Sequence, residues 1–175
     1  MSIAALALVY GTLSYIPKLY VSGGLGMSGR YLVLFMAVVT KAGDVGAYVL
    51  GSMTARRENG NHKLSSRLSQ KKSWEGLAGG ILSSAVAAVF MGMLLGDRLA
   101  FRETQVVGLS SAVFLGLLFA LLGLAGDLAV SSLKRAAKVK DSGRLPGLGG
   151  VLDIMDSLLF VAPVFYAYVV LRTLV

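Results

Sequence analysis

Four aspartates lie inside or at the ends of strongly apolar stretches of the sequence: Asp44, Asp127, Asp153 and Asp156. A carboxylate at membrane depth costs on the order of a few kcal/mol, so it persists where it faces a cavity, a cation or a partner. Asp153 and Asp156 are three residues apart, so a helix over this segment would carry both on one face. These acids predict a polar site built among apolar helices.

A polar stripe is predicted on the helix that carries Asp127. Ser131, Lys134 and Lys138 follow it at helical spacing, and a glycine-rich segment, 145–150, leads on to the two later acids. Oxygen ligands without Cys or His suit a hard cation such as Mg²⁺. Neighbouring Lys and Arg suit polyphosphate, and a glycine-rich turn before a helix lets backbone N–H groups approach it. The pattern therefore favours phosphoryl or nucleotidyl chemistry at the membrane surface.

Each feature also has a simpler interpretation. Asp153 alone could cap the helix that follows it. Lys134 to Lys140 could be the basic flank of a membrane helix, and Asp127 could pair with Lys134 on its own helix. An ion or proton pathway would also need acids at membrane depth.

The composition indicates an integral membrane protein. Of the 175 residues, 55% are hydrophobic and 15% are charged, against roughly 25% charged in soluble domains. This excludes a water-soluble enzyme and a disordered tail. The absence of Cys excludes disulfides and thiolate chemistry, and a single His excludes a histidine-rich zinc or haem site. The net charge of +8 fits basic cytoplasmic loops, so no nucleic-acid partner is expected.

The elements that must position the acids are apolar helices, because lipid leaves no other way to satisfy the backbone. We predict an all-α polytopic fold of about five transmembrane helices with a polar cavity on the cytoplasmic side. The chain forms one membrane domain, 1–175, with N-terminal helices over 1–40 and the functional core over 41–175. The five stretches are Ile3 to Ile16, Tyr31 to Leu50, Gly76 to Gly96, Val106 to beyond Asp127, and Val151 to Val175.

Two loops, 56–72 and 134–144, carry most of the 17 Lys and Arg residues. They are separated by two helices, so they lie on one side of the membrane, which the positive-inside rule makes cytoplasmic. The N-terminus is then cytoplasmic and the C-terminus external. No Lys or Arg precedes Lys18, so no secretory signal is expected.

The order of these residues resembles the phosphatidate cytidylyltransferases, also called CDP-diacylglycerol synthases. Upstream, Asp44-Val45-Gly46-Ala47-Tyr48 is similar to the family's Asp-x-x-Ala-Tyr, and 69–76 is similar to its Ser-Pro-Lys-Lys-Thr-x-Glu-Gly. Family His, Arg, Gln and Pro positions are occupied here by Leu148, Ile154, Leu124 and Gln70. The downstream block consists of Gly126-Asp127-Leu128, Ser131, Lys134-Arg135, Lys138, Lys140-Asp141, Pro146-Gly147, Gly149-Gly150, Asp153 and Asp156.

The resemblance implies transfer of CMP from CTP to phosphatidate by a Mg²⁺-dependent enzyme of a bacterial-type cell membrane, with its active site facing the cytoplasm and a capacity to form homodimers. It assigns catalysis to Asp127, Lys134, Arg135, Asp153 and Asp156, with the three aspartates as metal ligands. It assigns substrate binding to Asp44, Lys71, Lys72, Ser131, Lys138, Lys140, Asp141, Gly149 and Gly150.

Two alternatives remain open. One keeps the chemistry but changes the acceptor to another lipid phosphate. The other is a non-catalytic membrane protein, either a truncated binding remnant or an ion-conducting bundle. Typical family members have further N-terminal helices, so we expect a compact member or a piece that lacks part of the lipid-facing wall.

Overall fold

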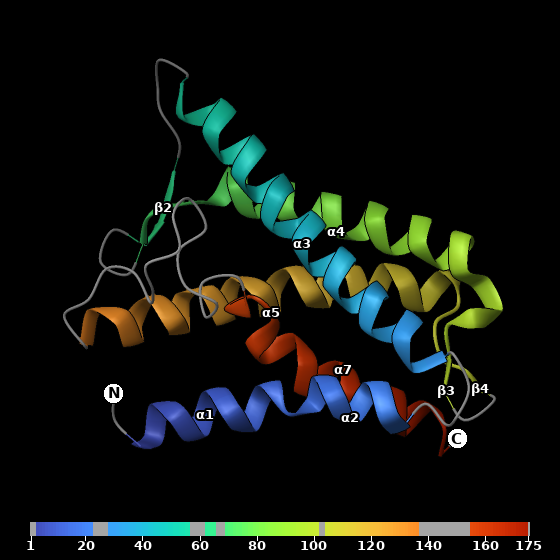
Figure 1. The fold of residues 1–175 in the computed structure, drawn as a ribbon. Coiled ribbons are helices and arrows are strands. Elements are labelled where there is room, and N and C mark those ends of the chain that lie inside the picture. Colours follow the sequence, from blue (N-terminus) through green and yellow to red (C-terminus); the bar gives the residue numbers. More distant parts are fainter. Residues whose placement is uncertain are drawn as a thin grey trace.

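The computed structural model describes residues 3–22, 28–56, 62–65, 69–101, 104–136 and 155–174, and these are mainly helical (Figure 1). Two short hairpins lie at opposite ends of the helices. In chain order the elements are α1 (Ile3–Leu13), α2 (Tyr15–Ser22), α3 (Ser28–Ala55), β1 (Lys63–Ser65), β2 (Ser69–Ser73), α4 (Trp74–Leu95), the 3₁₀ helix η1 (Gly96–Arg98), β3 (Ala100–Phe101), β4 (Thr104–Gln105), α5 (Leu109–Ala136) and α7 (Leu158–Arg172).

Three of the described helices are long and apolar enough to cross a membrane: Gly29–Ala55, Trp74–Arg98 and Leu109–Ala136. They correspond to the second, third and fourth predicted stretches. Helix α7 is apolar but shorter, at 15 residues. The helical, membrane-spanning character of the fold is therefore supported, while the count of five crossings stays a prediction.

The first predicted stretch is divided into two helices rather than one. Pro17 has no N–H to donate to the carbonyl of Leu13, where α1 ends. The hydroxyl of Ser14 also donates to the carbonyl oxygen of Gly11 at 2.7 Å, which competes with helical pairing. Helix α2 then continues through Pro17, the third residue of that helix, because a first-turn residue needs no helical N–H partner.

The start of the last predicted stretch, 151–154, lies outside the described residues, and the described part contains a turn. Helix α7 starts at Leu158, and Asp156 lies in the turn just before it. Met155 is helical and Asp156 follows it directly, while Asp153 lies outside the described residues, so the helical face that the two acids would share stays a prediction. The backbone carbonyl oxygen of Asp156 lies directly against Gly126 of α5.

Helices α3 and α4 pack backbone to backbone along a seam of small residues. A Cβ added at Gly46 would lie 2.7 Å from the carbonyl oxygen of Gly79, and one added at Gly79 would lie 2.7 Å from that of Gly46. The hydroxyl of Ser84 donates across the seam to the carbonyl oxygen of Val39 at 3.0 Å. Small residues that admit such close approach are typical of helix pairs in membranes. The seam fixes the two helices as a pair.

Three buried phenylalanines join α7 to α3 and α5. The ring of Phe165 lies 6.0 Å from that of Phe35 and 5.2 Å from that of Phe119, measured between centroids. All three side chains are fully buried. The cluster holds the middle of α7 against α3 and α5.

Candidate active site

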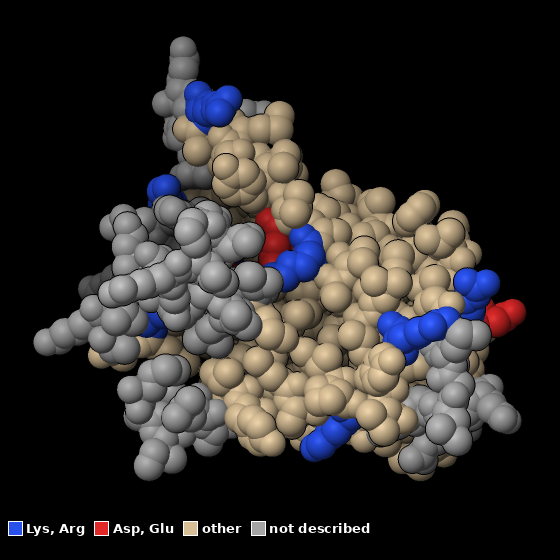
Figure 2. Space-filling view, in the orientation of Figure 1, with Lys and Arg blue, Asp and Glu red and all other residues tan. Residues whose placement is uncertain are grey.

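A cavity of about 360 Å³ lies among α3, the junction of β2 with α4, α5 and the turn before α7. Figure 2 shows acidic and basic atoms meeting in a recess near the middle of one face, with further Lys and Arg atoms toward its edges. Five charged side chains line the cavity: Lys41, Asp44, Lys72, Asp127 and Asp156. They come from four segments that are far apart in sequence, so the cavity exists through the packing of these segments.

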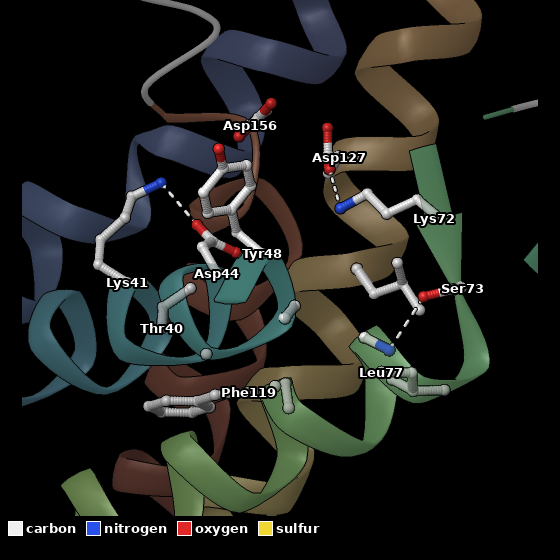
Figure 3. A pocket seen from close by; sticks show the side chains of 16 residues that line it. Thr40, Lys41, Asp44, Tyr48, Lys72, Ser73, Leu77, Phe119, Asp127 and Asp156 are labelled. Carbon is white, nitrogen blue, oxygen red and sulfur yellow. Dashed lines mark hydrogen bonds and ion pairs between the residues drawn. The ribbon is translucent and has the colours of Figure 1, made fainter. Parts of the chain in front are cut away.

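An ion pair joins the hairpin to α5 on one side of the cavity. The ammonium group of Lys72 contacts the carboxylate of Asp127, and both side chains are about three-quarters buried (Figure 3). The next residue, Ser73, accepts a hydrogen bond from the backbone N–H of Gly76 at 3.1 Å and so caps α4. The cap fixes the direction in which the strand that carries Lys72 enters the helix.

Glu75 holds the other strand of this hairpin to the first turn of α4. The backbone N–H of His62 donates to both carboxylate oxygens of Glu75, at 3.1 and 3.2 Å. The ring nitrogen Nδ1 of His62 lies 2.7 Å from Oε1 of Glu75. The backbone N–H of Trp74 donates to the carbonyl oxygen of His62 at 3.0 Å. The position of Lys72 therefore rests on this contact as well as on the ion pair with Asp127.

A second polar network lies on the opposite side of the cavity, between α3 and α7. The ammonium group of Lys41 donates to Oδ2 of Asp44 at 2.9 Å and to Oγ of Ser157 at 2.7 Å. Ser157 Oγ donates in turn to Asp44 Oδ2 at 2.8 Å. Three groups thus contact one another in a closed triangle, and Ser157 is fully buried.

Asp156 lies between these two groups (Figure 3). It is 9% exposed, and its Oδ1 accepts the backbone N–H of Ser157 at 2.7 Å. Burial, together with the nearby charge of Asp127, raises the pKa of Asp156 to about 6. Two carboxylates, those of Asp127 and Asp156, therefore face one cavity.

This arrangement fits a hard divalent cation. Asp127 and Asp156 offer oxygen ligands alone, which is the donor set that Mg²⁺ prefers. A cation would also offset the repulsion that raises the Asp156 pKa. Within the described ranges no group of three or more acidic, His or Cys side chains is gathered, and Asp153, the third predicted ligand, lies outside them.

The structure brings four of the predicted site residues to the cavity: Asp44, Lys72, Asp127 and Asp156. Ser131, Lys134 and Arg135 lie on α5 beyond Asp127 and do not line it. Lys71 lies on β2, but its side chain is not described. The remaining predicted residues, Lys138, Lys140, Asp141, Gly149, Gly150 and Asp153, lie outside the described residues.

Sequence reasoning did not assign Lys41, Tyr48 or Ser157 to the site. The signal for Lys41 is a cation within an apolar helix, three residues before an acid, which is a spacing at which side chains pair. Tyr48 stands one turn after Asp44 and lines the cavity. Nothing in the local sequence reveals that Ser157 contacts residues more than a hundred positions earlier.

Comparison with known proteins gives a consistent result. A family model described as "Cytidylyltransferase family" matches residues 1–172. The chain is 37% identical over 142 residues to the Escherichia coli protein YnbB, covering 81% of this chain and 43% of that one.

Two further relatives carry the name phosphatidate cytidylyltransferase. One, from Haemophilus influenzae, is 36% identical over 144 residues, and the match covers 80% of this chain and 46% of the relative's length. The other, from Bacillus subtilis, is 37% identical over 139 residues, covering 79% and 47%. The chain thus spans somewhat less than half the length of these curated relatives.

Proposed function

The chain belongs to the cytidylyltransferase family, and we propose that it acts as a CTP:phosphatidate cytidylyltransferase. The proposed reaction transfers CMP from CTP to the phosphate of phosphatidate, giving CDP-diacylglycerol and pyrophosphate. Two relatives that bear this name support the proposal.

The observation that carries the proposal is the convergence of Asp44, Lys72, Asp127 and Asp156 on one cavity. They come from α3, β2, α5 and the turn before α7, which are far apart in sequence. The volume of about 360 Å³ is within the range of small-molecule sites. Acids beside a cation in a partly apolar cavity suit a charged nucleotide better than a neutral lipid tail.

In the proposed reaction a phosphatidate oxygen attacks the α-phosphorus of CTP. The bond from that phosphorus to the bridging oxygen breaks, and pyrophosphate leaves with the negative charge. The ammonium group of Lys72 is placed to exchange Asp127 for a phosphate and to stabilise that charge. No side chain needs to form a covalent intermediate, which agrees with a chain that has no Cys.

Mg²⁺ is part of the proposal. Asp127 and Asp156 would hold it, together with Asp153 by resemblance. Bound there, it would neutralise phosphate charge and polarise the reacting phosphoryl group. Ser131, Lys134 and Arg135 remain candidates for the lipid phosphate, since α5 carries them past the cavity.

The finer membrane arrangement is also proposed: about five crossings, with the cavity facing the cytoplasm. Basic residues flank the cavity end of the helices, with Arg56 after α3 and Lys134 and Arg135 in the last turn of α5. The chain has no Cys, so a single Arg56→Cys substitution gives one labelling site. A membrane-impermeant maleimide should react with it in inverted vesicles and not in intact cells.

The homodimer implied by the resemblance likewise stays a prediction.

The direct test uses protein purified in mild detergent with α-labelled CTP, phosphatidate and Mg²⁺. Label should appear in the lipid phase and disappear with EDTA. Label that appears with another lipid phosphate but not with phosphatidate would move the proposal to a different acceptor. Folded protein that yields no lipid label with any lipid phosphate would overturn the transferase.

A further inference from the structure

We propose that Lys41 is a positioning residue for the acids of the cavity, an inference that rests on the proposed function. Its ammonium group bonds Asp44 Oδ2 at 2.9 Å and Ser157 Oγ at 2.7 Å, and so connects α3 to the turn before α7. That turn carries Asp156. Lys41 thereby fixes the positions of two cavity acids: Asp44 by direct contact, and Asp156 through the turn that carries it.

The behaviour of Ser157 supports this role. It precedes α7 at the position where a serine side chain normally caps a helix, yet it makes no capping hydrogen bond. Its hydroxyl instead donates to Asp44 and accepts from Lys41. A capping serine contributes about 1 kcal/mol to a helix. The turn forgoes that contribution, and its hydroxyl serves the network around Asp44 instead.

The burial of the turn explains why one cation can fix it. Ser157 is fully buried and Asp156 is 9% exposed, and Gly126 of α5 lies against the backbone of both. Movement of the turn away from α5 is therefore resisted from the α3 side, where Lys41 and Asp44 contact Ser157. Without the ammonium group, the hydrogen bond from Ser157 to Asp44 is what remains of these contacts between α3 and the turn in the described part of the chain.

Lys41 and Lys72 have different surroundings. Lys72 pairs with one acid across the cavity, whereas Lys41 bonds an acid of its own helix and a neutral hydroxyl on another. A phosphate could replace Asp127, the partner of Lys72 among the described residues, at the cost of that contact. Removing Lys41 from its partners would release the turn as well. This difference assigns Lys72 to substrate and Lys41 to positioning.

The test compares Lys41→Met, which removes the charge at similar length, with Lys41→Arg, which keeps it. Arg56→Met is the matched control, because Arg56 lies exposed after the same helix and does not line the cavity. Two readouts are used. One is kcat and KM for CTP, and the other is hydrogen exchange of segment 155–160, which needs no activity.

We expect Lys41→Met to lower kcat about 10- to 100-fold, the range typical of residues that orient metal-binding groups. KM for CTP should change by less than about threefold, since the acids matter most in the transition state. Exchange of segment 155–160 should accelerate. Lys41→Arg and Arg56→Met should stay within about threefold of the unaltered protein in all three quantities.

The double variant Lys41→Met/Ser157→Ala shows whether Lys41 and Ser157 act on kcat through one shared network or independently of each other. It should be no more than about twofold slower than Lys41→Met, because contacts in a shared network are not additive. A rise in KM with unchanged kcat would make Lys41 a substrate ligand and overturn the positioning role. Equal activity of Lys41→Met and Lys41→Arg would also overturn it.

Failure of the proposed function gives a different result. In that case the unaltered protein transfers no CMP, and the exchange measurement alone decides. If segment 155–160 exchanges faster in Lys41→Met than in the unaltered protein, and at the unaltered rate in Arg56→Met, Lys41 is supported as the residue that holds the turn. Unchanged exchange overturns the inference whether or not the protein is active.

Discussion

Lys72 and Asp127 form an ion pair that connects strand β2 to the middle of helix α5 across the wall of the cavity (Figure 3). Both partners are groups that the proposed reaction needs for other purposes, the cation for phosphate and the acid for Mg²⁺. The pair therefore keeps two unlike charges compensated in a partly buried site, and in the proposed reaction substrate and metal would replace it.

Asp127→Asn should abolish CMP transfer, with a loss of at least about 100-fold. An amide keeps the size of the side chain but removes the charge that pairs with Lys72 and that a cation would need. Transfer of label from CTP to lipid measures the loss. Size-exclusion chromatography should show that the variant still extracts and elutes as the unaltered protein does. Activity within threefold would remove Asp127 from the site.

Lys72→Met should raise KM for CTP about tenfold or more. The substitution leaves the apolar stem in place and deletes the ammonium group that lines the cavity from the hairpin. Lys72→Arg should recover most of the affinity because it restores the charge. Lys18→Met, on α2 and outside the cavity, is the control and should behave as the unaltered protein. A KM that stays constant in Lys72→Met would contradict phosphate binding by this residue.

Gly126→Ala should lower thermal stability and activity together. The added Cβ would collide with the backbone carbonyl oxygen of Asp156, and overpacking of this kind costs about 1–3 kcal/mol. Gly11→Ala is the matched control, because nothing lies within 4 Å of a Cβ at Gly11. It should leave stability unchanged or slightly raised. Thermal unfolding in detergent checks both, and equal melting temperatures would argue against the close approach of the turn to α5.

Glu75→Ala should loosen the hairpin that carries Lys72. The carboxylate accepts the backbone N–H of His62 at 3.1 and 3.2 Å, and alanine leaves that N–H without it. Hydrogen exchange over 62–65 and 69–73 should accelerate, and KM for CTP should rise more than kcat falls. Glu75→Gln keeps one acceptor oxygen, so its exchange rate and its KM for CTP should lie between those of the unaltered protein and those of Glu75→Ala. If exchange is unaltered in Glu75→Ala, the hairpin is held by other contacts.

The sequence predicted the parts of the site that depend on residue type. Asp44, Asp127 and Asp156 stand out because a carboxylate within an apolar stretch is costly unless it faces a cavity, a cation or a partner. Lys72 stands out through the resemblance of its segment to the family. The contacts of Ser157 with Lys41 and Asp44 were not predictable, because they span more than a hundred residues. They follow from how α7 packs on α3, and no local pattern encodes that packing.

The helix boundaries show the same division. The three long helices follow directly from hydropathy, since each is a continuous apolar run. The break after Leu13 depends on the missing N–H of Pro17 and on the hydrogen bond from the Ser14 hydroxyl to the carbonyl oxygen of Gly11. Hydropathy averages over such details, so the first predicted stretch, Ile3 to Ile16, did not show its division into two helices.

The glycine seam between α3 and α4 also bears on the order in which the molecule assembles. Residues 28–95 form a hairpin of two helices that are neighbours in sequence, and such local contacts form early in folding. This unit already holds Lys41, Asp44 and Lys72, whereas Asp127 and Asp156 arrive with α5 and the turn before α7. Both cations and one acid thus belong to the early unit, and the other two acids come with the later ones. The cavity takes shape only at docking, when Asp127 reaches Lys72 and Ser157 reaches Lys41.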